Sequence, residues 1–207
     1  MVITIARSFG SGGKSIALEL GERMGIPCYE NEILDMASDL SGINKKFFYE
    51  GDEDVKQSLL DKMIAKTSRN IVATPMDKNF ISNANLFNFQ SQIIRELALK
   101  EDCIIVGKCA DYVLGDLKNV FRFFIDAPRG ACINSIMNKL QVAELEADRL
   151  IDKTDRYRAD YYRVYTGGSW KDPVNYDLII NSAKVGRANV ASLIIDYISS
   201  KTGRKWR

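Results

Sequence analysis

A glycine-rich stretch near the amino terminus carries the clearest chemistry in this sequence. Residues 8–15 read SFGSGGKS, which matches the phosphate-binding pattern G-x-x-x-x-G-K-[ST] except that Ser8 replaces the first glycine. Lys14 would reach the β- and γ-phosphates of ATP, and the hydroxyl of Ser15 would coordinate Mg²⁺. Consecutive backbone N–H groups would form a concave nest for the phosphates, closed by the positive end of the following helix. Those groups belong to Gly10, Ser11, Gly12 and Gly13.

The neighbouring segments favour a nucleotide site over the alternative, a glycine-rich turn with an exposed lysine. Residues 2–6 (VITIA) form a short β-branched apolar run, which predicts a buried strand. From Gly13 to Met24 apolar residues recur every four positions, which predicts a helix that stops at Gly25. Serine tolerates many turn conformations, so Ser8 changes the geometry of the loop entrance more than its chemistry.

Four more short apolar runs indicate strands, and helical patterns separate them. The strands are expected at 26–30, 103–107, 120–126 and 176–181. Helices are expected at 56–66, 91–100, about 129–165 and about 187–200, and residues 73–90 read as irregular. This order predicts an α/β fold with a five-stranded parallel sheet covered on both faces.

Two mostly helical stretches interrupt this sheet within what reads as one domain. We expect a core of about 1–30, 92–128 and 176–207. The first insertion spans about 31–91 and the second about 129–175. The length of 207 residues suits a single domain of this kind.

Composition narrows the possible chemistry. The chain has no histidine, which excludes histidine as a general base or metal ligand. The net charge of +2 gives no reason to expect nucleic-acid binding. No apolar run approaches the roughly 18 residues of a membrane span, and no signal peptide is evident, so a cytoplasmic protein is expected. The four cysteines lack metal-site spacing and are expected to be buried, reduced thiols.

Charged residues follow the third expected strand, where ligands of open α/β sheets bind. Lys108 could contact the phosphate acceptor or the phosphates, and Asp111 could hydrogen-bond a base or a hydroxyl. A solvated charge pair on a loop explains these two residues equally well. Asp126, at the end of the fourth expected strand, could support Mg²⁺ through water or simply cap the strand.

Arginines in the second insertion are further candidates for phosphate binding. Three recur every seven residues and so share one helix face: Arg149, Arg156 and Arg163. Arg158 lies on another face. Cationic groups of this kind neutralise charge in phosphoryl transfer. The alternative is ordinary surface ion pairing, because Asp152 and Asp160 stand four residues either side of Arg156.

Three stretches resemble, in order, the cytidylate kinase-like family of P-loop proteins, which are relatives of the nucleoside monophosphate kinases. They are residues 3–34, 93–114 and 155–186. The resemblance runs over nearly the whole chain and is weakest between about 42 and 87. Family members often have arginine where this chain has Lys14, and their Gly-Arg after the third strand is Gly107 and Lys108 here.

The resemblance implies a central sheet, a first insertion that holds the acceptor, and a second that acts as a lid. It matches Arg156 and Arg158 to lid arginines that reach the transferred phosphoryl group. Arg163, which shares the helix face of Arg156, is a candidate for acceptor binding. Glu30 is a candidate for orienting the acceptor, although a helix N-terminal charge is an equally good interpretation. Contacts to adenine are implied for 182–185, including Ser182 and Lys184.

Several aromatic side chains of the second insertion could stack a base, and helical spacing suits core packing at least as well. They are Tyr157, Tyr161, Tyr162, Tyr165 and Trp170. Together these patterns predict an ATP- and Mg²⁺-dependent kinase that phosphorylates CMP or a similar small acceptor. The alternatives are a kinase of an alcohol or a nucleoside, and a nucleotide-binding regulatory protein without turnover. A homo-oligomer is compatible with the sequence.

Overall fold

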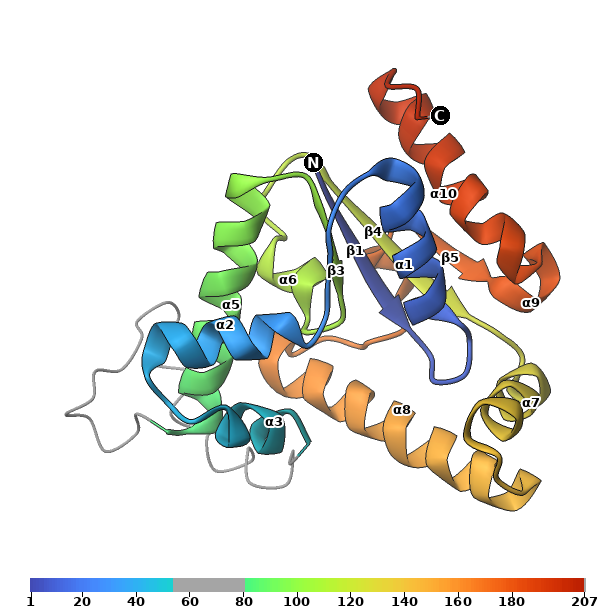
Figure 1. Cartoon of the computed structure of the whole chain (residues 1–207), viewed down its shortest axis with the longest axis horizontal. Coiled ribbons are helices and arrows are strands. Elements are labelled where there is room, and N and C mark those ends of the chain that lie inside the picture. Colours follow the sequence, from blue (N-terminus) through green and yellow to red (C-terminus); the bar gives the residue numbers. More distant parts are fainter. Residues whose placement is uncertain (54–80, 207) are drawn as a thin grey trace.

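The computed structural model describes residues 1–53 and 81–206 (Figure 1). The strands are β1 (Val2–Arg7), β2 (Cys28–Tyr29), β3 (Cys103–Val106), β4 (Val120–Asp126) and β5 (Leu178–Asn181). The helices of the first half are α1 (Gly13–Met24), α2 (Glu32–Ser41), α3 (Lys45–Glu53) and α5 (Asn83–Lys100). Those of the second half are α6 (Ala110–Val113), α7 (Arg129–Leu140), α8 (Glu144–Thr166), the 3₁₀ turn η1 (Pro173–Asn175), α9 (Ser182–Val185) and α10 (Arg187–Thr202).

The strands form one parallel sheet in the order β2-β3-β1-β4-β5, as the sequence predicts. β1 lies at its centre, with Ile3 in register with Ile104 of β3 and Phe121 of β4. Because all strands run the same way, their carboxyl ends share one edge of the sheet. Figure 1 shows α8 running along that edge.

Two hydrophobic clusters cover the two faces of the sheet, so the fold has three layers. Alternate residues of β1 divide between them: Ile3 and Ile5 lie in one cluster, and Val2 and Ala6 in the other. The first cluster is completed by α1 and α10, and the second by side chains of α2, α5, α6 and α8. A smaller third cluster joins α7 to α8 through Cys132, Ile136, Ala147 and Ile151.

Helix α1 matches its sequence prediction at both ends. It spans Gly13–Met24, and Gly25 ends it with a left-handed φ of 66°. Its apolar stripe of Ile16, Leu20 and Met24 is buried in the first cluster. The cysteines are all free thiols, and three of them are buried.

Two expectations need correction. Residues 83–90 are helical rather than irregular, because Ser82 caps α5 through the N–H of Asn85 and the new turns bury Leu86, Phe87 and Phe89. The helix expected over 129–165 is two helices, broken after Leu140 by Gln141, whose φ is 56°. The helix expected at 56–66 lies outside the described residues.

Within residues 1–53 and 81–206, no helix combines the length and the apolar character that crossing a membrane would require.

Candidate active site

The glycine-rich loop joins the carboxyl end of β1 to the amino end of α1, where an anion cradle must lie. Gly10 and Gly12 have backbone φ values of 85° and 86°, which residues with a Cβ atom rarely adopt. Gly12 is the N-cap of α1 and has no side chain to occupy the first N–H groups of the helix. Lys14 and Ser15 are exposed in the first turn of that helix.

Ser8 begins the loop, and its contacts show how a serine is accommodated where the pattern has a glycine. Its N–H donates to the carbonyl of Ile125 at 3.0 Å, and its carbonyl accepts the hydroxyl of Ser11 at 2.8 Å. Its own Oγ is buried and has no hydrogen-bond partner among the described residues. A buried hydroxyl without a partner, open first-turn N–H groups and an exposed lysine and serine fit a magnesium-bound triphosphate. Lys14 and the loop N–H groups would hold the phosphates, and Ser15 would hold the metal.

Two side chains from the carboxyl-terminal part of the chain fix this loop from outside. Ser182, fully buried, donates its hydroxyl to the Ser11 carbonyl at 2.6 Å. Arg187 donates to the Gly10 carbonyl at 2.7 Å and packs over Gly12, where an added Cβ would lie 3.1 Å from its Nε. Ser182 is therefore engaged with the loop itself. Lys184 is exposed, and its backbone N–H donates to Asn181.

A charge network links the loop to a neighbouring cavity. Lys14 Nζ lies 2.5 Å from Oε2 of Glu30, and the guanidinium of Arg7 pairs with Oε1 of the same carboxylate. Glu30 follows β2 and is largely buried, with 15% of its side chain exposed. Burial works to raise its pKa, but the charges of Arg7 and Lys14 outweigh this and hold the pKa of Glu30 below its usual range.

The cavity, of about 580 Å³, opens beside the loop at the carboxyl ends of β1, β2 and β3. Its cationic lining residues are Arg7, Lys108, Lys153 and Arg158, and its acidic ones are Glu30 and Asp111. Its aromatic wall is formed by Tyr157, Tyr161, Tyr162 and Trp170. Tyr161, Tyr162 and Trp170 are also buried in the second hydrophobic cluster. Core packing of these aromatic side chains is therefore compatible with a role in lining the cavity.

The backbone at one side of the cavity is strained. Gly107, Lys108 and Cys109 have consecutive positive φ values of 77°, 56° and 53°, which is uncommon for residues with a side chain. This left-handed turn ends β3 and starts α6. It places Asp111 in the cavity wall, 8% exposed, with Oδ2 accepting the Tyr162 hydroxyl at 2.7 Å. Burial raises the pKa of Asp111, against the opposing effect of that hydrogen bond.

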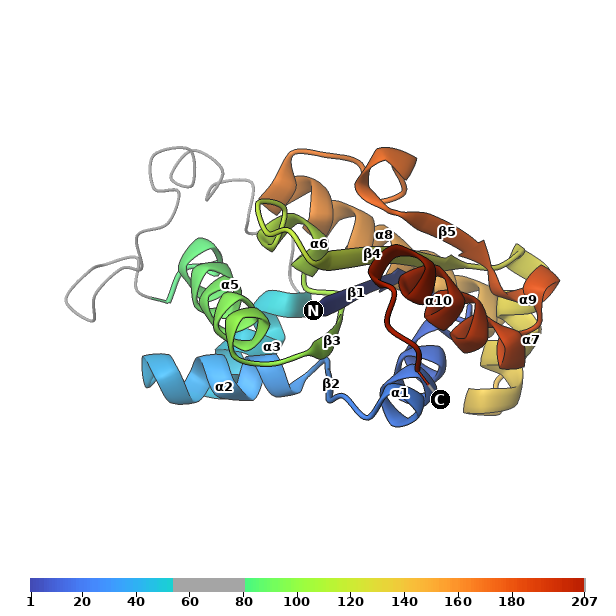
Figure 2. The same cartoon turned by 90° about the horizontal axis from the view of Figure 1, so that it is seen from above.

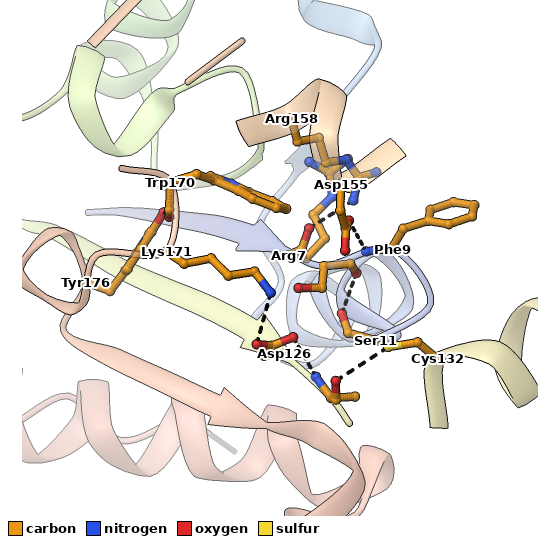
Figure 3. A network of polar contacts seen from close by, with 12 residues as sticks. Arg7, Phe9, Ser11, Asp126, Cys132, Asp155, Arg158, Trp170, Lys171 and Tyr176 are labelled. Carbon is orange, nitrogen blue, oxygen red and sulfur yellow. Dashed lines mark hydrogen bonds and ion pairs between the residues drawn. The ribbon is translucent and has the colours of Figure 1, made fainter. Parts of the chain in front are cut away.

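Helix α8 contacts the entrance of the glycine-rich loop directly (Figure 3). Asp155 accepts the Phe9 N–H at 2.7 Å, and Arg158 donates to the Arg7 carbonyl at 2.9 Å. The Arg158 guanidinium also lies 5.7 Å from the centroid of the Phe9 ring. Burial raises the pKa of Asp155, opposed by the Phe9 N–H and by Arg158.

Asp126, which ends β4, takes part in a second set of contacts at this edge. Its Oδ1 accepts the N–H of Ala127 at 2.9 Å, and its Oδ2 lies 3.3 Å from Nζ of Lys171 (Figure 3). Lys171 also lies 5.6 Å from the centroid of the Phe124 ring. The carboxylate is therefore engaged with both backbone and side chain.

The structure brings together most of the residues that the sequence singled out. Glu30, Lys108, Asp111 and Arg158 line the cavity beside the loop that carries Lys14. Arg156 and Arg163 are exposed and lie outside the cavity lining. The alternative considered for Arg156, ion pairs with Asp152 and Asp160, is not formed: Asp152 pairs with Arg129, and Asp160 pairs with Arg163.

Sequence reasoning missed several residues of the site: Arg7, Lys153, Asp155, Lys171 and Arg187. Arg7 had a usable signal, since it ends β1 at the residue before the loop. Lys153, Asp155, Lys171 and Arg187 reach the site through the packing of α8, of the segment after it and of α10. No local sequence pattern predicts that packing.

The fold and the site define a P-loop α/β protein with a small-molecule cavity beside the loop. The sequence model of the cytidylate kinase-like family matches residues 2–184, and the chain belongs to that family. This membership makes it a P-loop kinase.

Solved structures agree with this fold. An uncharacterized protein from Eubacterium ventriosum is 27% identical with a TM-score of 0.71, over 97% of this chain and 99% of that chain. The protein TT1252 from Thermus thermophilus is 14% identical with a TM-score of 0.52, over 98% of this chain and 97% of that chain. None of the curated proteins matches this sequence significantly.

Proposed function

We propose that the protein transfers the γ-phosphate of ATP, bound with Mg²⁺, to a nucleoside monophosphate such as CMP or to a similar small acceptor. The observation that carries this proposal is the carboxylate of Glu30, which joins Lys14 of the glycine-rich loop to Arg7 in the wall of the cavity. A donor site and an acceptor site thus meet at one cluster of charges.

On the donor side, the loop N–H groups and Lys14 bind the phosphates, with Arg187 and Ser182 keeping the loop in shape. Mg²⁺, held by Ser15, neutralises charge on the β- and γ-phosphates when bound. Lys184 and the segment around it lie beside the loop and are candidates for contact with the adenine.

On the acceptor side, the cavity offers what a nucleoside monophosphate requires. Lys108, Lys153 and Arg158 supply positive charge for its phosphate, and the aromatic wall supplies surfaces for its base. Asp111 can accept a hydrogen bond from an amine or a hydroxyl. No side-chain base is needed, because the acceptor phosphate is already anionic at neutral pH.

Region 129–175 would act as the lid. Its helix α8 supplies one wall of the cavity, so its movement toward the core would exclude water and limit wasteful hydrolysis of ATP. Arg158, which lines the cavity, would reach the transferred group. Arg156 and Arg163 stay candidates only for contacts that a movement of this lid would create.

The test is to incubate the protein with ATP and Mg²⁺ together with CMP, dCMP, UMP or AMP and to follow ADP. At least one monophosphate should raise turnover well above the acceptor-free rate. ATP should also raise the melting temperature, and Lys14→Ala should abolish that rise. If no monophosphate raises turnover, the acceptor assignment fails; an unchanged ATP response in Lys14→Ala contradicts the donor site.

One observation favours a second candidate, a kinase whose acceptor is a hydroxyl. Glu30 is ionised, largely buried and at the junction of loop and cavity, where it could receive a hydroxyl proton. Glu30→Gln separates the two. It should reduce turnover at least about a hundredfold for a hydroxyl acceptor, which loses its base, and less than about tenfold for a monophosphate, which loses only the carboxylate that holds Arg7 and Lys14.

A further inference from the structure

Arg7 lies at the end of the central strand, in a position that none of the candidate arginines of α8 occupies. It is the last residue of β1, directly before the glycine-rich loop, and its side chain is only 15% exposed. Its guanidinium lines the cavity and shares the Glu30 carboxylate with Lys14. Two cations from the central strand and the loop therefore converge on one pair of oxygens, at the boundary between the donor site and the cavity.

We propose that Arg7 is a catalytic residue whose guanidinium binds the phosphoryl group while it passes from ATP to the acceptor. This inference rests on the proposed function. In the transfer, the bond between the γ-phosphorus and the β–γ bridging oxygen breaks, leaving its electron pair on ADP. A new bond forms from the acceptor oxygen to the same phosphorus. The equatorial oxygens carry negative charge throughout.

The geometry around Glu30 is that of an oxyanion site. A carboxylate already lies between a guanidinium and an ammonium there, and phosphoryl oxygens have the same charge and similar hydrogen-bonding needs. Arginine suits this place because its planar fork binds two oxygens at once, which lysine cannot do. In this arrangement Glu30 holds Arg7 and Lys14 ready, and is the group that the phosphoryl oxygens replace.

The backbone around Gly107 leaves space for the Arg7 guanidinium. Gly107 packs against it so closely that an added Cβ would lie 2.3 Å from Nη1 of Arg7. The strained turn that starts at Gly107 thus leaves space for the side chain. The backbone of Arg7 is fixed as well, since Arg158 donates to its carbonyl. These contacts hold the guanidinium in place, so that only its partner changes, from Glu30 to the phosphoryl oxygens, when the transition state forms.

The test needs no knowledge of the acceptor. Aluminium fluoride with ADP and Mg²⁺ mimics the phosphoryl group in transfer, so its binding can be compared with that of ADP alone by calorimetry. The wild type should bind ADP with aluminium fluoride at least about a hundredfold tighter than ADP. Arg7→Ala should lose at least about tenfold of that gain while its affinity for ADP stays the same.

Matched variants separate catalysis from structure. Arg7→Lys keeps a cation and should also lose most of the gain, because the fork is gone. Arg95→Ala removes an arginine from the exposed pair with Asp116 and should change neither affinity. Added methylguanidinium should restore part of the gain to Arg7→Ala, which a purely structural role would not allow.

The outcomes distinguish this inference from the proposed function. If the wild type shows the gain and Arg7→Ala keeps it, Arg7 is not catalytic and the proposed function stands. If Arg7→Ala loses affinity for ADP and for the mimic equally, its role is structural and the inference is overturned. If the wild type binds no ADP, the proposed function fails and the inference fails with it.

Discussion

Gly10 shows at the scale of one residue why the loop is built from glycine. Its φ of 85° is costly for any residue with a Cβ, and an added Cβ would lie 2.7 Å from the carbonyl oxygen of Cys132 in α7. We therefore expect Gly10→Ala to lower the free energy of unfolding by about 1–2 kcal/mol and to weaken ATP binding at least about tenfold. Urea unfolding and ATP titration measure the two effects.

Gly130→Ala is the matched control for that change. Gly130 lies in the first turn of α7, and an added Cβ would meet nothing within 4 Å. Alanine there should raise the free energy of unfolding by about 0.5–1 kcal/mol and leave ATP binding unchanged. Equal effects of the two substitutions on ATP binding would contradict the proposed role of the loop conformation.

Asp111 gives a second residue-scale prediction, for the dependence of stability on pH. Burial raises its pKa in the folded protein above the ordinary value of 3.8, so the folded state holds the proton more tightly than the unfolded state. This group's contribution to stability is therefore greatest at low pH and falls as pH rises above about 4, through the raised pKa.

Asp111→Asn removes this titration and keeps an oxygen that can accept the Tyr162 hydroxyl. The free energy of unfolding of the variant, minus that of the wild type, should increase as pH rises above about 4. Urea unfolding at a series of pH values measures it. If the difference in free energy of unfolding between variant and wild type stays constant with pH, the pKa of Asp111 is not raised in the folded protein.

Helix α8 separates Arg156 and Arg158, two arginines that the family resemblance assigns to the same role. Arg158 faces the core, lines the cavity and donates to the Arg7 carbonyl, whereas Arg156 lies on the exposed face. Arg158→Ala should lower kcat/KM for the acceptor at least about a hundredfold, and Arg156→Ala less than about threefold. Steady-state kinetics of the two variants is the measurement. A large loss in Arg156→Ala would mean that the lid turns this face inward during the reaction.

The sequence predicts most of the elements, because their signals are local. Apolar runs mark each strand, and the spacing of Ile16, Leu20 and Met24 together with Gly25 marks α1. The left-handed break at Gln141 carries no glycine or proline, so the boundary between α7 and α8 was missed. The amino-terminal half of α5 was missed because asparagines mask an apolar face that only packing against α2 and α8 makes useful.

The loop was predictable as a unit because it is contiguous, whereas Glu30, Lys108, Asp111 and Arg158 were predicted one by one and without their partners. The loop from Gly10 to Ser15 is recognised from glycines, a lysine and the flanking strand and helix. The partnership of Arg7 with Glu30 depends on the order of strands in the sheet and on the space at Gly107, and that of Asp155 with Phe9 depends on how α8 packs. Such pairs are far apart in the sequence and leave no pattern of spacing.

At the scale of the whole molecule, the two sites share one helix. Viewed from above, α8 passes beneath the sheet and reaches from the side of α6 to α7 (Figure 2). It supplies Leu150, Lys153, Thr154 and Tyr157 to the cavity, and through Asp155 and Arg158 it also fixes the entrance of the glycine-rich loop. A ligand that orders α8 at the cavity must therefore also affect the loop.

We accordingly expect ATP and the acceptor to bind cooperatively. A saturating acceptor should tighten ATP binding about five- to fiftyfold, and by linkage ATP should tighten acceptor binding by the same factor. Asp155→Ala breaks the contact with the Phe9 N–H and should reduce this coupling to less than about twofold. Asp155→Asn retains an oxygen that can accept that N–H and should preserve most of the coupling. Calorimetric titration of each ligand, alone and with the other present, measures the four affinities for each variant. Coupling that survives in Asp155→Ala would mean that the two sites communicate through Glu30 or through the contact of Arg158 with Arg7, and not through Asp155.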